Sequence, residues 1–253
     1  MAKPYLSLII PVRNEEATIL QTLIAVDYAL SLSEFSSEVI VVDDGSHDST
    51  PEIVVHFEKV LRSLRTIRGR ESQGVGWAMK EGMRVAKGNV RMIVLPTRIH
   101  WLDNRNAIMN VIRDGADVVM GSRNKERYKR GVVDDIQFIM RKMGNALLCG
   151  KEASLVSDVR FGGIAMRESV AEWLFSFPEL SNESAIMLQL AVLALGNGYT
   201  LRELPYHRDE VSAFGGFRDW MRMWYRSFRI RKIARTPHAY RMEHSGTEDS
   251  EEV

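Results

Sequence analysis

The chain has 253 residues, of which 45% are hydrophobic and 26% are charged, and its formal net charge is +1. These values are typical of a globular protein with one large α/β domain or two small ones, and they give no bulk attraction to nucleic acid. A single cysteine, Cys149, excludes an intrachain disulfide. No apolar run approaches the ~18 residues needed to span a bilayer, so we expect a cytoplasmic protein, with membrane contact limited to a peripheral one.

Strand and helix patterns alternate along the first half of the chain. In order, we expect a strand at 6–11 that stops at Pro11, a helix at 16–30, a strand at 38–42, a helix that begins at Thr50 and carries Ile53, Phe57, Val60 and Leu64, a short strand at 66–68, a helix at 76–86, a strand at 90–95, a helix at 101–113 and a strand at 117–120. This alternation predicts an α/β fold with a mostly parallel sheet and helices on both faces.

The second half of the chain is less regular. We expect helices at 135–148, 168–175 and 183–195, short strands at 164–166 and 199–204, and a final amphipathic helix at 217–233. The end of the chain, from Ser245 onwards, is polar and acidic and is typical of a disordered tail. We therefore divide the chain into a domain at 1–214, a basic helical segment at 215–240 and an acidic tail at 241–253.

Polar residues and glycines follow the predicted strands at the edge where α/β sheets bind ligands. PVRNEE follows the first strand, and Asp43 and Asp44 follow the second directly. Carboxylates there can accept hydrogen bonds from a ribose or a base, and glycines let a ligand approach the backbone. A solvated turn explains Asp43 and Asp44 about equally well when they are taken alone, but the pairing with PVRNEE favours a ligand site.

Five stretches in order resemble the family 2 glycosyltransferases of the GT-A fold, especially the dolichol-phosphate mannose synthase branch. They are PVRNEE, VVDDGSHDST, ESQGVGWAMKEGMRVAKGN, GADVVMGSR and SDVRFGGIAMR, within residues 5–205. The resemblance implies transfer of a sugar from a GDP- or UDP-sugar to a polyprenyl phosphate. It also implies a nucleotide site, for which the candidates are Pro11, Arg13, Asn14, Glu15, Asp43, Asp44, Gly45, Ser46 and Gly74.

The metal motif of that family is degenerate in this chain. The family places an Asp-x-Asp pair, followed two residues later by Gln, after the strand that begins beyond Gly88. The corresponding positions here are Leu95, Thr97 and Ile99, of which only Thr97 has a side-chain oxygen. Because hard cations need oxygen ligands, we expect the usual divalent metal site to be lost and no metal cofactor to be used, unless another acid such as Asp103 reaches in.

Other positions that grip phosphate or the acceptor in the family also differ. The acid on the late helix maps to Gln189, and an ungapped count puts Val211 and Phe217 at two basic positions. The resemblance leaves Arg123, Arg141 and Arg208 as catalytic candidates. Charge on the leaving diphosphate would then fall to arginines, with Arg98 as a further choice.

The predicted final helix carries arginines at spacings of four, four and three beside an aromatic stripe. The basic positions are Arg218, Arg222, Arg226 and Arg229, and the aromatic face includes Trp220 and Trp224. This pattern fits a helix on an anionic membrane surface. Packing on the domain fits equally well, a homodimer contact is a third interpretation, and nucleic-acid binding is disfavoured because no recognised module accompanies the charge.

Two functions stay open at this point. The first is an active glycosyltransferase that binds a nucleotide-sugar without the usual metal. The second is a catalytically inactive pseudo-glycosyltransferase that acts as a binding or scaffold subunit, for example beside an active homologue.

Overall fold

The computed structural model describes residues 3–123 and 163–206. In chain order the elements are β1 (Leu6–Val12), α1 (Ile19–Ser31), β2 (Ser37–Asp43), α2 (Thr50–Glu58), β3 (Leu64–Arg68), α3 (Val75–Val85), β4 (Val90–Val94), the 3₁₀ helix η1 (Pro96–Asn104), α4 (Arg105–Arg113), β5 (Val118–Arg123), β6 (Gly163–Arg167), α6 (Glu168–Phe175), α7 (Ala185–Gly196) and β7 (Leu201–Tyr206). The predicted segment boundary at 214 and the predicted elements at 135–148, 217–233 and 241–253 lie outside the described residues.

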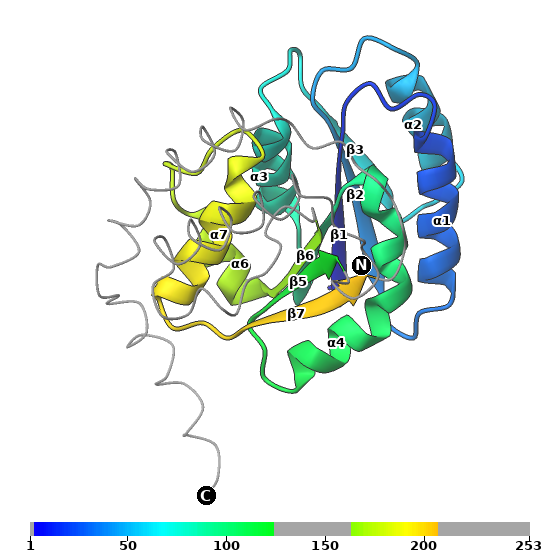
Figure 1. Ribbon diagram of the computed structural model, residues 1–253. Helices are drawn as coiled ribbons and strands as arrows, with labels where there is room; N and C mark the ends of the chain where they lie inside the picture. The colour runs from blue at the N-terminus through cyan, green and yellow to red at the C-terminus, as the bar shows by residue number, and fades with distance from the viewer. Residues whose placement is uncertain (1–2, 124–162, 207–253) are drawn as a thin grey trace, which may run out of the picture.

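Seven strands form one mixed sheet in the order β3-β2-β1-β4-β6-β5-β7. The strands run parallel except β6, which is antiparallel to β4 and β5. Helices α1, α2 and α4 lie on one face of the sheet, and α3, α6 and α7 lie on the other (Figure 1). The predicted α/β class, with a mostly parallel sheet between helices, is confirmed.

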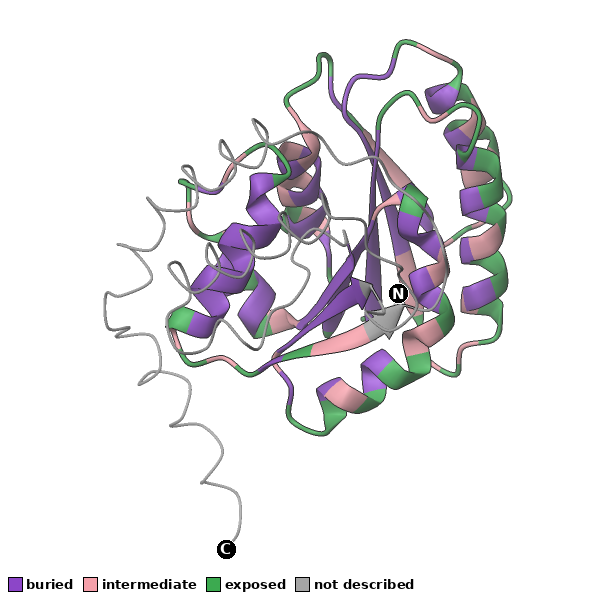
Figure 2. Ribbon diagram, in the orientation of Figure 1, coloured by how far each residue is buried: buried purple, intermediate pink, exposed green. Residues whose placement is uncertain are grey.

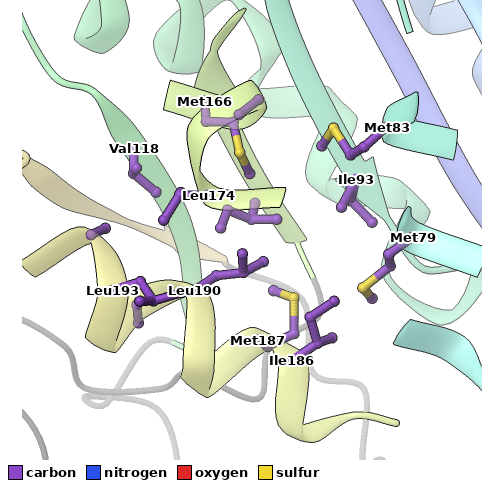
Figure 3. Packing of buried hydrophobic residues seen from close by; sticks show 14 of the residues in the cluster. Met79, Met83, Ile93, Val118, Met166, Leu174, Ile186, Met187, Leu190 and Leu193 are labelled. Atoms are coloured by element: carbon purple, nitrogen blue, oxygen red, sulfur yellow. The ribbon is translucent and has the colours of Figure 1, made fainter. Parts of the chain in front are cut away.

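Alternation along the central strands supplies two separate cores. In β2, Val39 and Val41 point into the core shared with α1, α2 and α4. Ile40 and Val42 point into the core shared with α3, α6 and α7, part of which is drawn in Figure 3. Both faces of the strand are therefore apolar, as expected for a parallel sheet covered on both sides, and Figure 2 shows the sheet as a buried layer.

The first strand does not stop at Pro11. It continues to Val12, and Pro11 pairs with Val42 of β2. On its other side β1 pairs with β4 only as far as Ile9. The missing N–H of Pro11 therefore leaves no gap in the β1–β4 ladder, which is why a proline is tolerated this deep in the sheet.

Two predicted helices were wrong in extent. The helix from Thr50 ends at Glu58, so Val60 lies beyond it, and Leu64 begins strand β3. The helix expected at 101–113 is divided, since a 3₁₀ segment runs from Pro96 to Asn104 before the α-helix begins at Arg105. Trp101 is fully buried in that segment, and this packing overrides the helical periodicity.

The strand order reverses between β1 and β4, because β2 and β3 follow β1 on one side and β4 is added on the other. Ligands in open α/β sheets bind at the carboxyl ends of the strands beside such a reversal. The loops after β1, β2 and β4 therefore surround the expected site.

Candidate functional site

The carboxyl ends of β1 and β2 lie side by side, with Val12 paired to Asp43. The next residue along, Asp44, donates its backbone N–H to the Val12 carbonyl at 3.0 Å. The loop that begins at Arg13 and the loop that begins at Asp44 therefore start from one point. The two sequence motifs PVRNEE and DDGS are brought together, as their places after two predicted strands indicated.

Asp43 is a buried carboxylate, 1% exposed, with two different oxygens. Its Oδ1 accepts hydrogen bonds from the Ser46 N–H at 2.9 Å and from the Ser46 hydroxyl at 2.5 Å. Its Oδ2 lies 3.3 Å from Nε of Arg68 but accepts no hydrogen bond among the described residues. Since buried carboxylate oxygens are normally hydrogen-bonded, Oδ2, which within the described ranges has only the Arg68 ion pair, is an acceptor with spare capacity.

Asp44 has a different environment, although it is also buried at 3% exposure. Its Oδ1 accepts the Gln73 N–H at 2.7 Å, and its Oδ2 accepts the Ser72 hydroxyl and the Gly74 N–H, each at 2.8 Å. The carboxylate thus holds the turn at residues 72–74 against the end of β2. The two adjacent acids therefore have separable roles, since both oxygens of Asp44 hold the loop while Oδ2 of Asp43 has no hydrogen bond from the described part of the chain.

The loop after β1 is fixed to the loop after β2 by reciprocal hydrogen bonds. Asn14 has a positive φ of 51°, its N–H donates to the Ser46 hydroxyl at 2.9 Å, and its Oδ1 accepts the His47 N–H at 3.0 Å. The Glu15 N–H donates to the Thr50 hydroxyl at 2.8 Å. The N–H groups of Asn14 and Glu15 and the Asn14 side-chain oxygen therefore hold the two loops together. Arg13, beside them in the chain, is exposed.

Asp48 extends the same network. Desolvation raises the pKa of the Asp48 carboxyl, but hydrogen bonds from the Thr50 side chain and from the Thr50 and Glu16 N–H groups outweigh it and hold the pKa below its ordinary value. The carboxylate thus stays charged where it joins the loop after β1 to the start of α2.

Two glycines of the predicted nucleotide site are needed for close packing of the chain on itself. Gly45 has a φ of 68°, and a Cβ there would lie 2.8 Å from the Glu71 carbonyl carbon. Gly74 has a φ of 105°, and a Cβ there would overlap the Asn182 carbonyl oxygen. That carbonyl accepts the Gly76 N–H at 2.7 Å. The first turn of α3 is therefore capped by the chain, which is a structural reason for the glycines that the sequence pattern did not reveal.

The segment around Asn182 is held from two further sides. Lys80 of α3 donates through Nζ to the Leu180 carbonyl at 3.2 Å and to the Asn182 side chain, and burial lowers its pKa. Gln189, at the position where the family has an acid, is 2% exposed and accepts the Ser181 N–H through Oε1 at 2.7 Å. Gln189 therefore pins this loop to α7.

The tip of β4 is apolar. Leu95 is partly buried against one core, and Ile99 is 7% exposed in the other. Thr97 is exposed, and Asp103, the next acid along the chain, has a side chain that is 71% exposed and lies 3.7 Å from Nδ1 of His100. One neutral hydroxyl does not match the oxygen-rich set that a divalent cation requires. In residues 3–123 and 163–206, no group of three or more His, Cys, Asp or Glu side chains is placed to hold a metal ion.

The arginine candidates are placed unevenly. Arg98 is 3% exposed in η1, and its Nη1 donates to the Thr97 carbonyl at 3.1 Å. Arg123 is the last residue of β5, while Arg141 and Arg208 lie outside the described residues. Sequence reasoning missed Arg68, whose position next to Asp43 follows from the β2–β3 register.

Within the described part of the chain, no helix is both long enough and apolar enough to cross a membrane.

Comparisons with known proteins agree with this architecture. Residues 7–173 match the family model "Glycosyl transferase family 2". A dolichol-phosphate mannosyltransferase from Pyrococcus furiosus is 26% identical over 205 residues, which are 79% of this chain and 55% of that protein. A dolichyl-phosphate beta-glucosyltransferase from Dictyostelium discoideum is 27% identical over 131 residues, 47% of this chain and 40% of that protein. The chain thus spans about half the length of these curated relatives or less.

Solved structures show the same fold at low identity. Glucosyl-3-phosphoglycerate synthase from Mycobacterium tuberculosis, in complex with Mn²⁺, UDP and glucosyl-3-phosphoglycerate, has a TM-score of 0.62 and 15% identity over 93% of this chain and 82% of that one. A mannosyltransferase from Pyrobaculum calidifontis, in complex with GDP-Man and Mn²⁺, has a TM-score of 0.60 and 18% identity over 94% of this chain and 66% of that one.

Proposed function

The chain belongs to glycosyl transferase family 2, and from this premise we propose that it binds a nucleotide-sugar at the carboxyl ends of β1 and β2. We further propose that it transfers the sugar to a polyprenyl phosphate or a similar acceptor without the metal site usual for the family. The relatives named above act on dolichol phosphate, and the structural neighbours bind UDP or GDP-Man. These names support the substrate classes proposed for this chain.

The observation that carries the donor site is Oδ2 of Asp43, which has an ion pair but no hydrogen bond in residues 3–123 and 163–206. This oxygen is buried, lies beside Arg68 and accepts no hydrogen bond among the described residues. A base N–H of a bound nucleotide would satisfy it, and Arg68 would then cover the same base or its ribose. The hydrogen bonds from Ser46 to the other oxygen hold the carboxylate in place before the ligand arrives, so little ordering cost is left for binding.

The apolar tip of β4 supports the proposal that the metal is dispensed with. With Leu95 and Ile99 packed into the cores, charge that develops on the leaving diphosphate would be met by cationic side chains, with Arg98, Arg123, Arg141 and Arg208 as the candidates. A phosphate acceptor is itself a nucleophile and needs little help from a general base. The chemistry would then depend on positioning the acceptor and on neutralising the leaving group.

The apolar tip of β4 also supports a second candidate function, that of an inactive binding subunit. If nothing replaces the cation, the protein would bind a nucleotide-sugar without turning it over, as a scaffold or binding subunit. The hydrogen-bonded loops after β1 and β2 favour retained binding in either case. Attachment to the cytosolic face of a membrane through the segment 215–240 and a homodimer through its aromatic face are further proposals, and both concern residues outside the described ranges.

Isothermal titration calorimetry of the full chain tests the donor site. The titrants are GDP-mannose and UDP-glucose, each with Mg²⁺, with Mn²⁺ and with EDTA. We expect one nucleotide to bind with an affinity that EDTA changes by less than about twofold, and Asp43→Asn to weaken it by about tenfold or more, which corresponds to ~1.4 kcal/mol. Asp114→Asn, at an exposed acid beyond α4, is the matched control and should bind as the wild type does.

Two results would contradict the proposal. Tight binding that appears only with Mg²⁺ or Mn²⁺ would show that the chain assembles a cation site after all. Binding of neither nucleotide would remove the donor-site proposal and leave the scaffold. If a nucleotide binds, transfer of radiolabelled sugar to a short-chain polyprenyl phosphate in EDTA separates the active enzyme from the inactive binding subunit.

A further inference from the structure

Helix α1 exposes a continuous apolar ridge on the side that faces away from the sheet. Leu20, Ile24 and Tyr28 on the helix and Leu32 at its C-cap follow one another at intervals of four residues, and they are 49%, 54%, 67% and 56% exposed. Figure 2 shows this outward side of α1 as exposed. The opposite side of the helix, with Ile19, Leu23 and Val26, is already buried against the sheet. The helix is therefore apolar on two sides, and only one of them is covered.

Helix α4 lies on the same face of the sheet and shows what an ordinary solvated surface looks like in this protein (Figure 1). Its sequence, RNAIMNVIR, turns Ile108, Met109 and Ile112 inward and leaves arginines and asparagines outside. In contrast, α1 has one charged residue, Asp27, in thirteen. A surface helix normally carries charged and polar residues on its outer face, so the outer face of α1 is built for contact with another surface.

The charge around the ridge restricts what that surface can be. Residues 14–58 contain no lysine or arginine, whereas Glu16, Asp27 and Glu34 flank the ridge. A helix that lies on anionic lipid needs lysine and arginine beside its apolar face. Arg105 of α4 donates through Nε to the Ser33 hydroxyl at 2.8 Å, beside Leu32 at one end of the ridge. The three acids outnumber this cation, so the local charge does not favour anionic lipid and fits a neutral apolar partner.

We propose that the α1 ridge is the contact with a second copy of this chain. Apolar side chains at i, i+4 and i+8 form a ridge that packs into the groove of a like helix at a crossing angle of about −50°. The middle of the ridge falls between Ile24 and Tyr28, so a two-fold axis there sets Ile24 of one copy against Tyr28 of the other. Leu20 and Leu32 then meet in the same way further out. Such a self-complementary arrangement closes as a dimer.

The exposed area agrees with a dimer. Four large side chains, each about half exposed or more, give an apolar patch on the order of 400 Å², within the range that is often functional on a monomer. A standard interface takes about 800 Å² from each partner, of which roughly two-thirds is apolar in homodimers, or about 500 Å². The ridge alone therefore offers most of the apolar area that one partner of a standard homodimer contributes.

The inference does not rest on the proposed function, because no residue of the ridge belongs to the donor site. It also differs from a contact through the segment 215–240. Size-exclusion chromatography with light scattering on the full chain, from about 1 to about 100 µM, tests it directly. We expect a mass of twice the 28.8 kDa of one chain at the upper concentrations.

A pair of matched variants assigns the contact to the ridge. Ile24→Glu combined with Tyr28→Glu should raise the dimer dissociation constant at least about tenfold, while the far-UV circular dichroism stays the same because both positions are exposed. Asn106→Glu combined with Asn110→Glu introduces the same charge, at the same spacing, on the exposed face of α4. This control should remain dimeric.

Three outcomes would overturn the proposal. One is a wild-type protein that stays monomeric over the whole concentration range. Another is a dimer that the α1 variant leaves intact. The third is a monomeric wild type that floats with phosphatidylcholine–phosphatidylserine vesicles and loses this property in the α1 variant, which would make the ridge a lipid contact.

Discussion

The tips of β2 and β4 lie on either side of β1 and differ in chemistry. At the tip of β2, two buried carboxylates accept hydrogen bonds from Ser46 and from the turn at residues 72–74. In the 3₁₀ segment after β4, Ile99, Trp101 and Leu102 are buried, together with the guanidinium of Arg98. The comparison shows one tip built on hydrogen-bonded carboxylates and another that packs apolar side chains around one buried arginine. The loops of the proposed donor site at β2 therefore do not depend on carboxylates at β4.

The largest effect on stability is expected when the Trp101 side chain is removed from the tip of β4. Trp101 is 0% exposed and is among the largest fully buried side chains of the described chain. Trp101→Ala should lower the free energy of unfolding by about 3–5 kcal/mol, because transfer free energy is lost and a cavity is left. Urea denaturation, followed by far-UV circular dichroism, measures the change.

The control is Thr97→Ala in the same 3₁₀ segment, which should change stability by no more than about 0.5 kcal/mol because Thr97 is exposed. If Trp101→Ala cost no more than Thr97→Ala, the tip of β4 would not be a packed part of the core. The contrast between the two tips would then disappear.

The next largest effect is expected at the polar tip. Asp44→Asn replaces one of two acceptor oxygens by a donor, so at least one of the N–H groups of Gln73 and Gly74 loses its partner. A buried donor left unpaired costs about 1–3 kcal/mol. We expect a loss of about 2 kcal/mol in the free energy of unfolding, together with weaker nucleotide binding because the turn at 72–74 loosens.

Asp43→Asn is the sharper comparison with this variant. Its amide oxygen can still accept the hydrogen bonds from Ser46, so stability should fall by less than in Asp44→Asn while nucleotide affinity falls by more. Equal losses of stability and affinity in the two variants would contradict this assignment, in which Asp44 stabilises the loop and Asp43 binds the nucleotide.

The sequence predicted which helices and strands form better than it predicted the residues at which they end. Apolar strands such as 38–42 alternate with helices along the chain, and this pattern predicts a parallel sheet covered on both faces. The order of the sequence motifs indicates the family. The continuation of β1 through Pro11 depends on where the β1–β4 ladder stops, which no local pattern records. The division of 101–113 depends on Trp101 entering the core, which is a tertiary effect that overrides periodicity.

For the candidate site, the sequence indicated which loops lie together but not the hydrogen bonds within them. Adjacent acids in VVDDGS look equivalent, and only the fold shows that Asp44 is committed to residues 72–74 while Asp43 keeps an acceptor. Gly74 was predicted to approach a nucleotide, but its neighbour in the fold is the Asn182 carbonyl, more than a hundred residues away. A role as a nucleotide ligand remains a prediction for both Asp44 and Gly74.

The last comparison tests how tightly the apolar tip is packed. Gly163 of β6 lies against Trp101, and a Cβ built on it would be 2.6 Å from Cε3 of the indole. Gly163→Ala should therefore destabilise the protein by about 1–3 kcal/mol through overpacking, although alanine normally suits a strand better than glycine. In a Trp101→Phe background the smaller ring leaves room, so the same substitution should cost less than half as much. The double-mutant cycle is measured by urea denaturation. Additivity within about 0.5 kcal/mol would mean that the methyl group and the indole do not meet, and the filled tip of β4 would then owe its packing to other residues.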